Sequence, residues 1–135
     1  MKTSVLKIIS KSFIIVSVLG LLSVAAMAMV NPQDVMDLVH VKITNNDAFS
    51  SLRGIYGGVG LTICFFLIYL LITEYQKALL FLCFFWGAYA FSRILTILIE
   101  GPLGAFGTQW LIIETIFFIA ALLILIISKR KSTVI

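Results

Sequence analysis

Four long apolar segments dominate the pattern of hydrophobic and polar positions along the chain. Each has about the 18 to 20 residues that an α-helix needs to cross a hydrocarbon core about 30 Å thick. The segments are residues 12–30, 52–73, 78–99 and 110–127. We therefore predict an all-α fold, an integral membrane four-helix bundle that forms a single membrane domain over residues 1–135.

Composition agrees with this pattern and leaves little room for another kind of protein. Hydrophobic residues make up 61% of the chain, charged residues make up 12%, and the mean hydropathy is +1.16. These values lie far from those of a soluble domain of this length. The four segments also leave almost no residues for a soluble domain.

Lysines and arginines indicate the orientation, because short loops rich in them stay on the cytoplasmic side of a membrane. Seven of the ten fall before the first segment, between the second and third, or after the fourth, at Lys2, Lys7, Lys11, Lys77, Lys129, Arg130 and Lys131. Both termini are therefore predicted to be cytoplasmic, with loops 31–51 and 101–109 outside. We expect a multi-pass protein of a cell membrane, the bacterial inner membrane. The net charge of +4 is largely this topology signal, and no basic soluble face for nucleic acid is expected.

The first segment has two interpretations. A lysine-rich start, an apolar stretch and the triplet Ala26-Met27-Ala28 also describe a secretory signal peptide, whose cleavage after Ala28 would leave three spans. We favour a retained span, because the apolar stretch is longer than the roughly 7 to 15 residues of a signal core.

The predicted outer loop contains its own helix signal. Asn31 precedes Pro32, which suits a helix cap followed by a first helical residue, and the middle of the loop is too apolar for a free linker. We expect a short helix that rests on the membrane interface or on the mouth of the bundle. A connector and a lid over a polar site are the two roles considered.

Two arginines and two glutamates lie in or at the edges of the apolar segments, at Arg53, Arg93, Glu100 and Glu114. A charged side chain inside a bilayer costs at least a few kcal/mol, so such residues usually face the protein interior, find a partner and mark a site. The predicted topology places all four towards the outer face, with Asp47 as an outer fifth member. We call these four residues the charged cluster.

The third segment carries a polar and aromatic stripe. Its members recur at spacings of three and four residues, which places Trp86, Tyr89, Arg93, Thr96 and Glu100 on one helix face. Arg93 lies about 10 Å deeper than Glu100, and Glu114 of the fourth segment is within its reach. An Arg93–Glu114 ion pair that only holds the helices is one interpretation. A site for an anionic or polar ligand group is the other.

The second segment begins with Arg53 and Tyr56, which lie near one face by helical spacing. Gly57, Gly60 and Cys64 form a stripe of small residues that would let a neighbouring helix approach closely. Arg53 is interpreted either as part of the site or as an anchor that reaches the membrane surface without a functional duty.

Several chemistries lack their residues. His40 is the single histidine and lies in the outer loop, which excludes a haem held by histidines of two spans and a histidine-rich metal site. Cys64 and Cys83 form no Cys-x-x-Cys pair and are expected to be packing residues. No catalytic residues and no metal are predicted, the cofactor is unknown, and the balance leans against an enzyme.

The order of the charged residues resembles a known family. The run Arg53-Gly54-Ile55-Tyr56-Gly57-Gly58, then Ser92-Arg93 before Glu100-Gly101, then Glu114, resembles the uncharacterised domain-of-unknown-function family 4345. That family is similar to the DoxX-like group of small four-helix membrane proteins. The resemblance covers about residues 45–127 and implies a four-helix bundle. Quinone-linked or thiol-related redox roles of some DoxX-like proteins would need cysteine pairs or histidines that this chain lacks.

Three functions are considered. The first is a binding or accessory membrane protein that holds a lipid, quinone or other amphiphile in an outer-leaflet pocket lined by Arg53, Tyr56, Trp86, Tyr89, Arg93, Glu100 and Glu114. The second is a small oligomeric transporter or channel that uses Glu114 and Arg93. The third is a purely structural interaction protein. The expected partners are membrane lipid and an amphiphilic small molecule, a second copy of the chain or a partner membrane protein, and no nucleic acid.

Overall fold

A computed structural model describes residues 3–132 of the chain and the side chains of residues 4–128. All regular structure in this part of the chain is helical. Four helical stretches are long and apolar enough to cross a membrane, namely Ser4–Val30, Asn46–Thr73, Tyr75–Ile99 and Ala105–Ser128. The predicted all-α, four-helix membrane fold is confirmed, and the chain is a multi-pass membrane protein.

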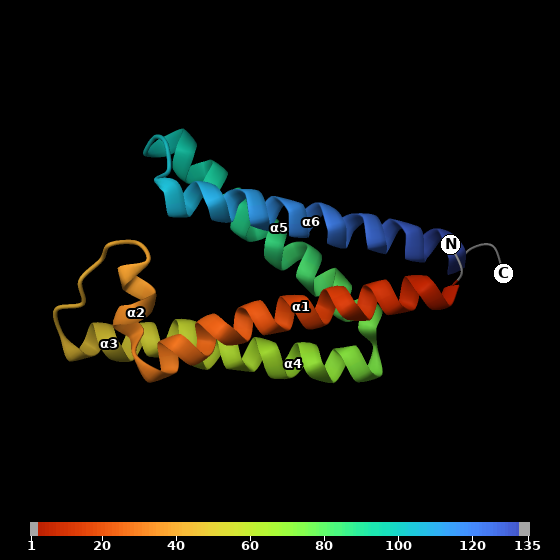
Figure 1. Cartoon of the computed structure of the whole chain (residues 1–135), viewed down its shortest axis with the longest axis horizontal. Coiled ribbons are helices and arrows are strands. Elements are labelled where there is room, and N and C mark those ends of the chain that lie inside the picture. The colour runs from red at the N-terminus through yellow and green to blue at the C-terminus, as the bar shows by residue number, and fades with distance from the viewer. Residues whose placement is uncertain (1–2, 133–135) are drawn as a thin grey trace. The chain divides into compact units, whose positions relative to one another are not determined.

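The elements in chain order are α1 (Thr3–Val30), α2 (Pro32–Asp37), α3 (Asn46–Leu52), the π-helical segment η1 (Arg53–Val59), α4 (Gly60–Thr73), α5 (Tyr75–Ile99) and α6 (Ala105–Ser132) (Figure 1). They form two compact units. The hairpin unit joins the start of α1, up to Ile14, with α5 and α6. The loop unit is Ile15–Ile72, which holds the rest of α1, α2, α3, η1 and α4.

Three of the membrane helices begin well before the apolar segments do. The second stretch begins at Asn46 rather than near residue 52, because the Asn45 side chain accepts a hydrogen bond of 2.8 Å from the Ala48 N–H and caps the helix. The last helix begins at Ala105 rather than near residue 110. Polar residues extend a helix beyond the hydrocarbon at little cost, so hydropathy alone places these starts too late.

In the hairpin unit, α5 and α6 are antiparallel neighbours joined by the short link 100–104 (Figure 1). Glu100 directly follows α5 and caps its C-terminus, and its N–H donates to the Thr96 carbonyl over 2.8 Å. Gly101 then takes a φ of 101°, a left-handed conformation that suits glycine, and Pro102 prevents the helix from continuing. The ring of Phe13, at the start of α1, lies 5.5 Å from that of Phe117 in α6.

In the loop unit, α1 packs closely against η1 and α4. A Cβ atom added at Gly60 would lie 2.9 Å from the Ala25 Cβ, and one added at Gly57 would lie 2.5 Å from the Met29 Sδ. The Cys64 thiol, one turn after Gly60, donates to the Val18 carbonyl over 3.8 Å. The predicted stripe of small residues is therefore a helix-packing surface.

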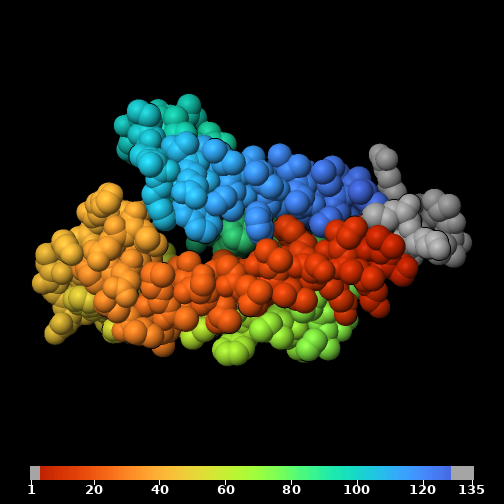
Figure 2. Space-filling model, in the orientation of Figure 1, coloured from red at the N-terminus to blue at the C-terminus, as the bar shows by residue number. Residues whose placement is uncertain are grey.

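The loop after α1 is folded rather than extended. Its helix α2 begins at Pro32, and the Asn31 Oδ1 atom accepts a hydrogen bond of 3.2 Å from the Gln33 N–H. Val35 and Met36 are buried against Ala28 of α1, with Tyr56 packed beside them. The side chains of this region form a compact knob at the end of the loop unit (Figure 2).

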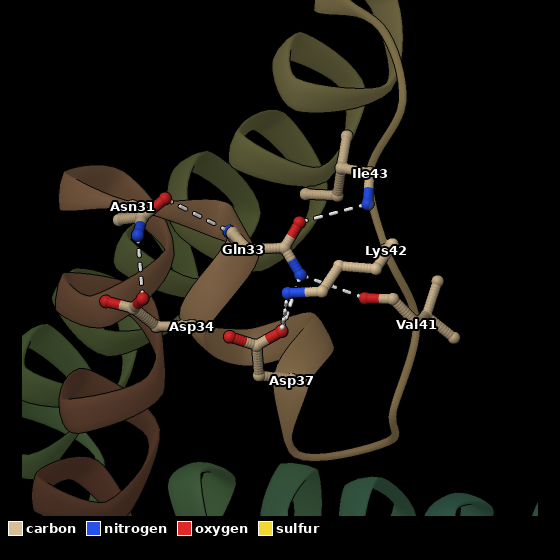
Figure 3. Close-up of polar contacts among 7 residues, drawn as sticks. All are labelled: Asn31, Gln33, Asp34, Asp37, Val41, Lys42 and Ile43. Atoms are coloured by element: carbon tan, nitrogen blue, oxygen red, sulfur yellow. Dashed lines mark hydrogen bonds and ion pairs between the residues drawn. The ribbon is translucent and has the colours of Figure 1, made fainter.

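The Gln33 side chain binds the extended segment that follows α2, at Val41 and Ile43 (Figure 3). Its amide nitrogen donates to the Val41 carbonyl over 2.9 Å and to Asp37 Oδ1 over 2.7 Å, and its amide oxygen accepts from the Ile43 N–H over 3.0 Å. Lys42 also contacts Asp37 Oδ1, with an Nζ–Oδ1 distance of 3.3 Å. These bonds keep the pKa of Asp37 below its ordinary value of 3.8, the Gln33 hydrogen bond first and Lys42 second.

Replacing Gln33 by Ala should raise the pKa of Asp37 towards 3.8, because it removes the largest cause of the lowering. Since the folded pKa is below the unfolded one, Asp37 stabilises the loop above about pH 3.8, and this contribution is lost as the pH falls through the folded pKa. NMR titration of the Asp37 carboxyl carbon measures the change in pKa, and denaturation at a series of pH values measures the change in stability. An unchanged Asp37 titration in Gln33→Ala would contradict the assignment.

Candidate functional site

A two-bonded ion pair joins the two helices of the hairpin unit. The Arg93 Nε atom of α5 donates to Glu114 Oε2 of α6 over 2.6 Å, and the Arg93 Nη2 atom donates to Glu114 Oε1 over 2.9 Å. This is the side-on fork in which guanidinium and carboxylate planes match. The Glu114 side chain is 2% exposed and that of Arg93 is 21% exposed. The predicted pairing of these two residues is present in the structure.

The helix lengths place this pair well inside the apolar part of the unit. Arg93 lies six residues before the end of α5, which is about 9 Å along the axis. Glu114 lies nine residues after the start of α6, or about 13 Å.

The two aromatic residues of the predicted stripe lie one and two turns from Arg93. Trp86 is buried, and its ring lies 5.0 Å from Phe117 of α6 and 5.2 Å from Phe85, edge to face in both cases. Tyr89 is exposed, and its ring lies 5.0 Å from Phe85. Trp86 therefore fixes the packing of α5 on α6, while Tyr89 is exposed one turn before Arg93.

The guanidinium of Arg93 has more N–H groups than Glu114 uses. It carries five N–H groups. Among the described residues, its hydrogen bonds go to Glu114 alone and use two of those groups. Ser92 and Thr96, its neighbours on α5, donate their hydroxyls to the carbonyls of Tyr89 and Ser92. The site can therefore offer a fixed cation with outward N–H groups to an oxygen-bearing ligand group.

Arg53 bonds to the backbone, whereas Arg93 bonds to a carboxylate. In the loop unit its Nε atom donates to the Met29 carbonyl over 3.0 Å, which satisfies one of the last carbonyls of α1. Tyr56 packs against the buried cluster of Ala28, Val35 and Met36. Both residues sit in the loop unit, whereas Arg93, Glu100 and Glu114 belong to the hairpin unit. The predicted convergence of all four charges stays a prediction.

Glu100 lies at the end of α5, exposed, and no ion pair between described residues includes it. Asp47 lies in the first turn of α3, where a negative charge favours the helix N-terminus. The two cysteines, Cys64 and Cys83, are buried free thiols. No group of three or more His, Cys, Asp or Glu side chains that could hold a metal occurs among the described residues.

The hairpin unit also contains a hollow away from the ion pair. It is an open-sided apolar groove of about 610 Å³ between α5 and α6. Leu80, Phe84 and Phe91 of α5 and Leu122 and Ile126 of α6 contribute to its lining. None of the seven predicted site residues takes part in it.

The sequence of the chain matches one protein family. The profile of the family described as Domain of unknown function (DUF4345) matches residues 9–125. The chain belongs to the DUF4345 family. The matched region contains all four residues of the charged cluster and every groove-lining residue except Ile126. Kinship of this DUF4345 chain with the DoxX-like group stays a prediction.

No curated protein and no solved structure matches the chain. The description of the DUF4345 family names no activity. One contributor to the site is absent from the sequence predictions: Phe117, which packs between Trp86 and Phe13. The signal for it was its position three residues after Glu114, on the same face of α6.

Proposed function

We propose that this DUF4345 protein binds the polar head of a membrane amphiphile, a lipid or a quinone, at the Arg93–Glu114 pair. The observation that carries the proposal is the unequal burial of the two partners. Glu114 is closed off at 2% exposure, while Arg93 keeps 21% of its side chain exposed and has N–H groups beyond those used by Glu114. A phosphate, carboxylate or carbonyl oxygen is the group that such donors recognise.

The buried glutamate supports binding by holding the guanidinium still. A long arginine side chain loses much rotamer freedom when a ligand fixes it. Here the two hydrogen bonds to Glu114 already hold the guanidinium, so less of that cost falls on binding. Tyr89, exposed one turn away, offers an aromatic ring beside the head group. Under the predicted topology this arrangement faces the outer leaflet.

The rival interpretation is that the ion pair only fixes α5 against α6. Both interpretations use the same two hydrogen bonds, and they differ in what the outward N–H groups of Arg93 contact. If the pair is purely structural, these N–H groups contact water or lipids without selectivity for a head group. A binding site gives them a ligand of defined head-group chemistry.

Native mass spectrometry of the full chain tests the proposal, with phosphatidylglycerol and a short-tailed ubiquinone as probes. Removing the cation in Arg93→Gln should weaken retention of the recognised probe about tenfold, which corresponds to about 1.4 kcal/mol. Lys42→Gln removes one positive charge from an exposed loop position and should leave retention unchanged.

A second variant separates binding from folding. Arg93→Met combined with Glu114→Leu replaces the pair by apolar side chains that can hold the helices together. It should fold and still lose the probe. Retention equal to wild type in this folded double variant, or no retention of either probe by the wild type, would establish a purely structural pair.

A further inference from the structure

The groove between α5 and α6 is independent of the ion pair. Phe91 lines the groove, whereas Arg93 follows two residues later, and helix residues two apart do not face each other. No side chain that contributes to its lining is charged. Its volume of about 610 Å³ lies within the roughly 300 to 1,000 Å³ of small-molecule pockets.

Its shape comes from small residues beside large ones. Gly87 lets the Phe118 ring lie directly against the α5 backbone, because a Cβ atom there would be 2.9 Å from the ring carbon Cδ2. Ala88, the next residue, is exposed and also lines the groove. On α5, Phe84 is 72% exposed and Phe91 is 65% exposed, so both rings project beside this hollow.

The length of the groove matches half a bilayer. On α5 it runs from Leu80 to Phe91, eleven residues and hence about 16 Å. One leaflet of a hydrocarbon core about 30 Å thick measures about 15 Å. The groove begins five residues after the start of α5, so under the predicted topology it lies mainly in the cytoplasmic leaflet.

We propose that this groove is a seat for one acyl chain of a cytoplasmic-leaflet phospholipid. A second copy of the chain suits it less well, because close helix pairing needs small residues along the contact and the two phenylalanine rings project there. A flexible hydrocarbon chain bends between the rings and fills the space at Ala88. A soluble partner does not reach a groove at this depth in a membrane helix pair.

Photolabelling of the full chain in lipid nanodiscs tests whether an acyl chain occupies the groove. The probe is a phosphatidylethanolamine that carries a diazirine on its acyl chain, and peptide mass spectrometry locates the label. Labelling at Phe84 and Phe91 should exceed by about tenfold that at Phe65 of α4, which is equally exposed at 68%. The preference comes from van der Waals contact between the chain and the groove walls, because the surrounding lipid is as apolar as the groove.

Filling the groove provides the matched control. Ala88→Phe should abolish the excess label at Phe84 and Phe91, while Ala26→Phe, at an exposed position of α1, should leave it intact. Ile126→Trp fills the groove from α6 and replaces Ala88→Phe if that variant does not fold. Equal labelling at Phe84 and Phe65, an excess that survives groove filling, or a crosslink between the α5 helices of two copies would overturn the proposal.

Discussion

Arg93→Met is expected to lower the free energy of unfolding by about 3 to 5 kcal/mol, the range for breaking a buried ion pair by removing one partner. The cost arises because Glu114, 2% exposed in the structure, is left as a carboxylate with neither of its two guanidinium hydrogen bonds. Denaturation of the purified chain in mixed micelles with increasing dodecyl sulfate, followed by circular dichroism, measures the change.

Two further variants show whether the loss comes from the unpaired charge of Glu114. Arg53→Met removes an arginine whose side chain makes one hydrogen bond among the described residues, to the Met29 carbonyl. Its loss should cost clearly less, no more than about 3 kcal/mol. Adding Glu114→Leu to Arg93→Met should recover most of the loss, because no unpaired charge then remains. A cost for Arg93→Met no larger than that for Arg53→Met would mean that Glu114 does not depend on its partner.

Gly60→Leu is expected to destabilise the loop unit by about 1 to 3 kcal/mol, the range for overpacking a close contact. The nearest atoms to an added Cβ are the Ala25 Cβ at 2.9 Å and the Ala25 Cα at 3.6 Å. Neither atom belongs to a flexible side chain, so α1 and α4 have to move apart. The same denaturation experiment measures the loss.

Gly57 and Ala25 supply the controls for this contact. An added Cβ at Gly57 meets mainly the Sδ and Cγ atoms of Met29, which a rotamer change can move, so Gly57→Ala should cost less than Gly60→Ala. Combining Ala25→Gly with Gly60→Ala exchanges the methyl group between the helices and should restore part of the lost stability. If Gly60→Ala is neutral by itself, the two helices are not held at this distance.

The membrane fold and the ion pair could be predicted from sequence for the same physical reason. Hydrocarbon tolerates neither a break in backbone hydrogen bonding nor an isolated charge. The first constraint makes each apolar run a helix, and the second indicates that Arg93 should meet Glu114. The partner of Arg53 could not be predicted, because a backbone carbonyl such as that of Met29 has no signature in the sequence.

Other features depend on geometry that hydropathy does not record. The π-helical turns of η1 widen the helix at residues 53–59 without any change in the apolar pattern. Gly87 and Phe118 both line the groove, and their close contact follows from how α5 and α6 are aligned. The helix starts at Asn46 and Ala105 depend on capping and on the turn at Gly101 rather than on burial.

The link between α4 and α5 is a single residue, Glu74, whose carboxylate pairs with Lys77 at 2.7 Å. Under the predicted topology this link faces the cytoplasm. A soluble protein that docks there meets little more than one helical turn, which is far less than the roughly 800 Å² per partner of a stable interface. Under that topology the link alone is therefore too small to form a stable interface with a cytoplasmic protein.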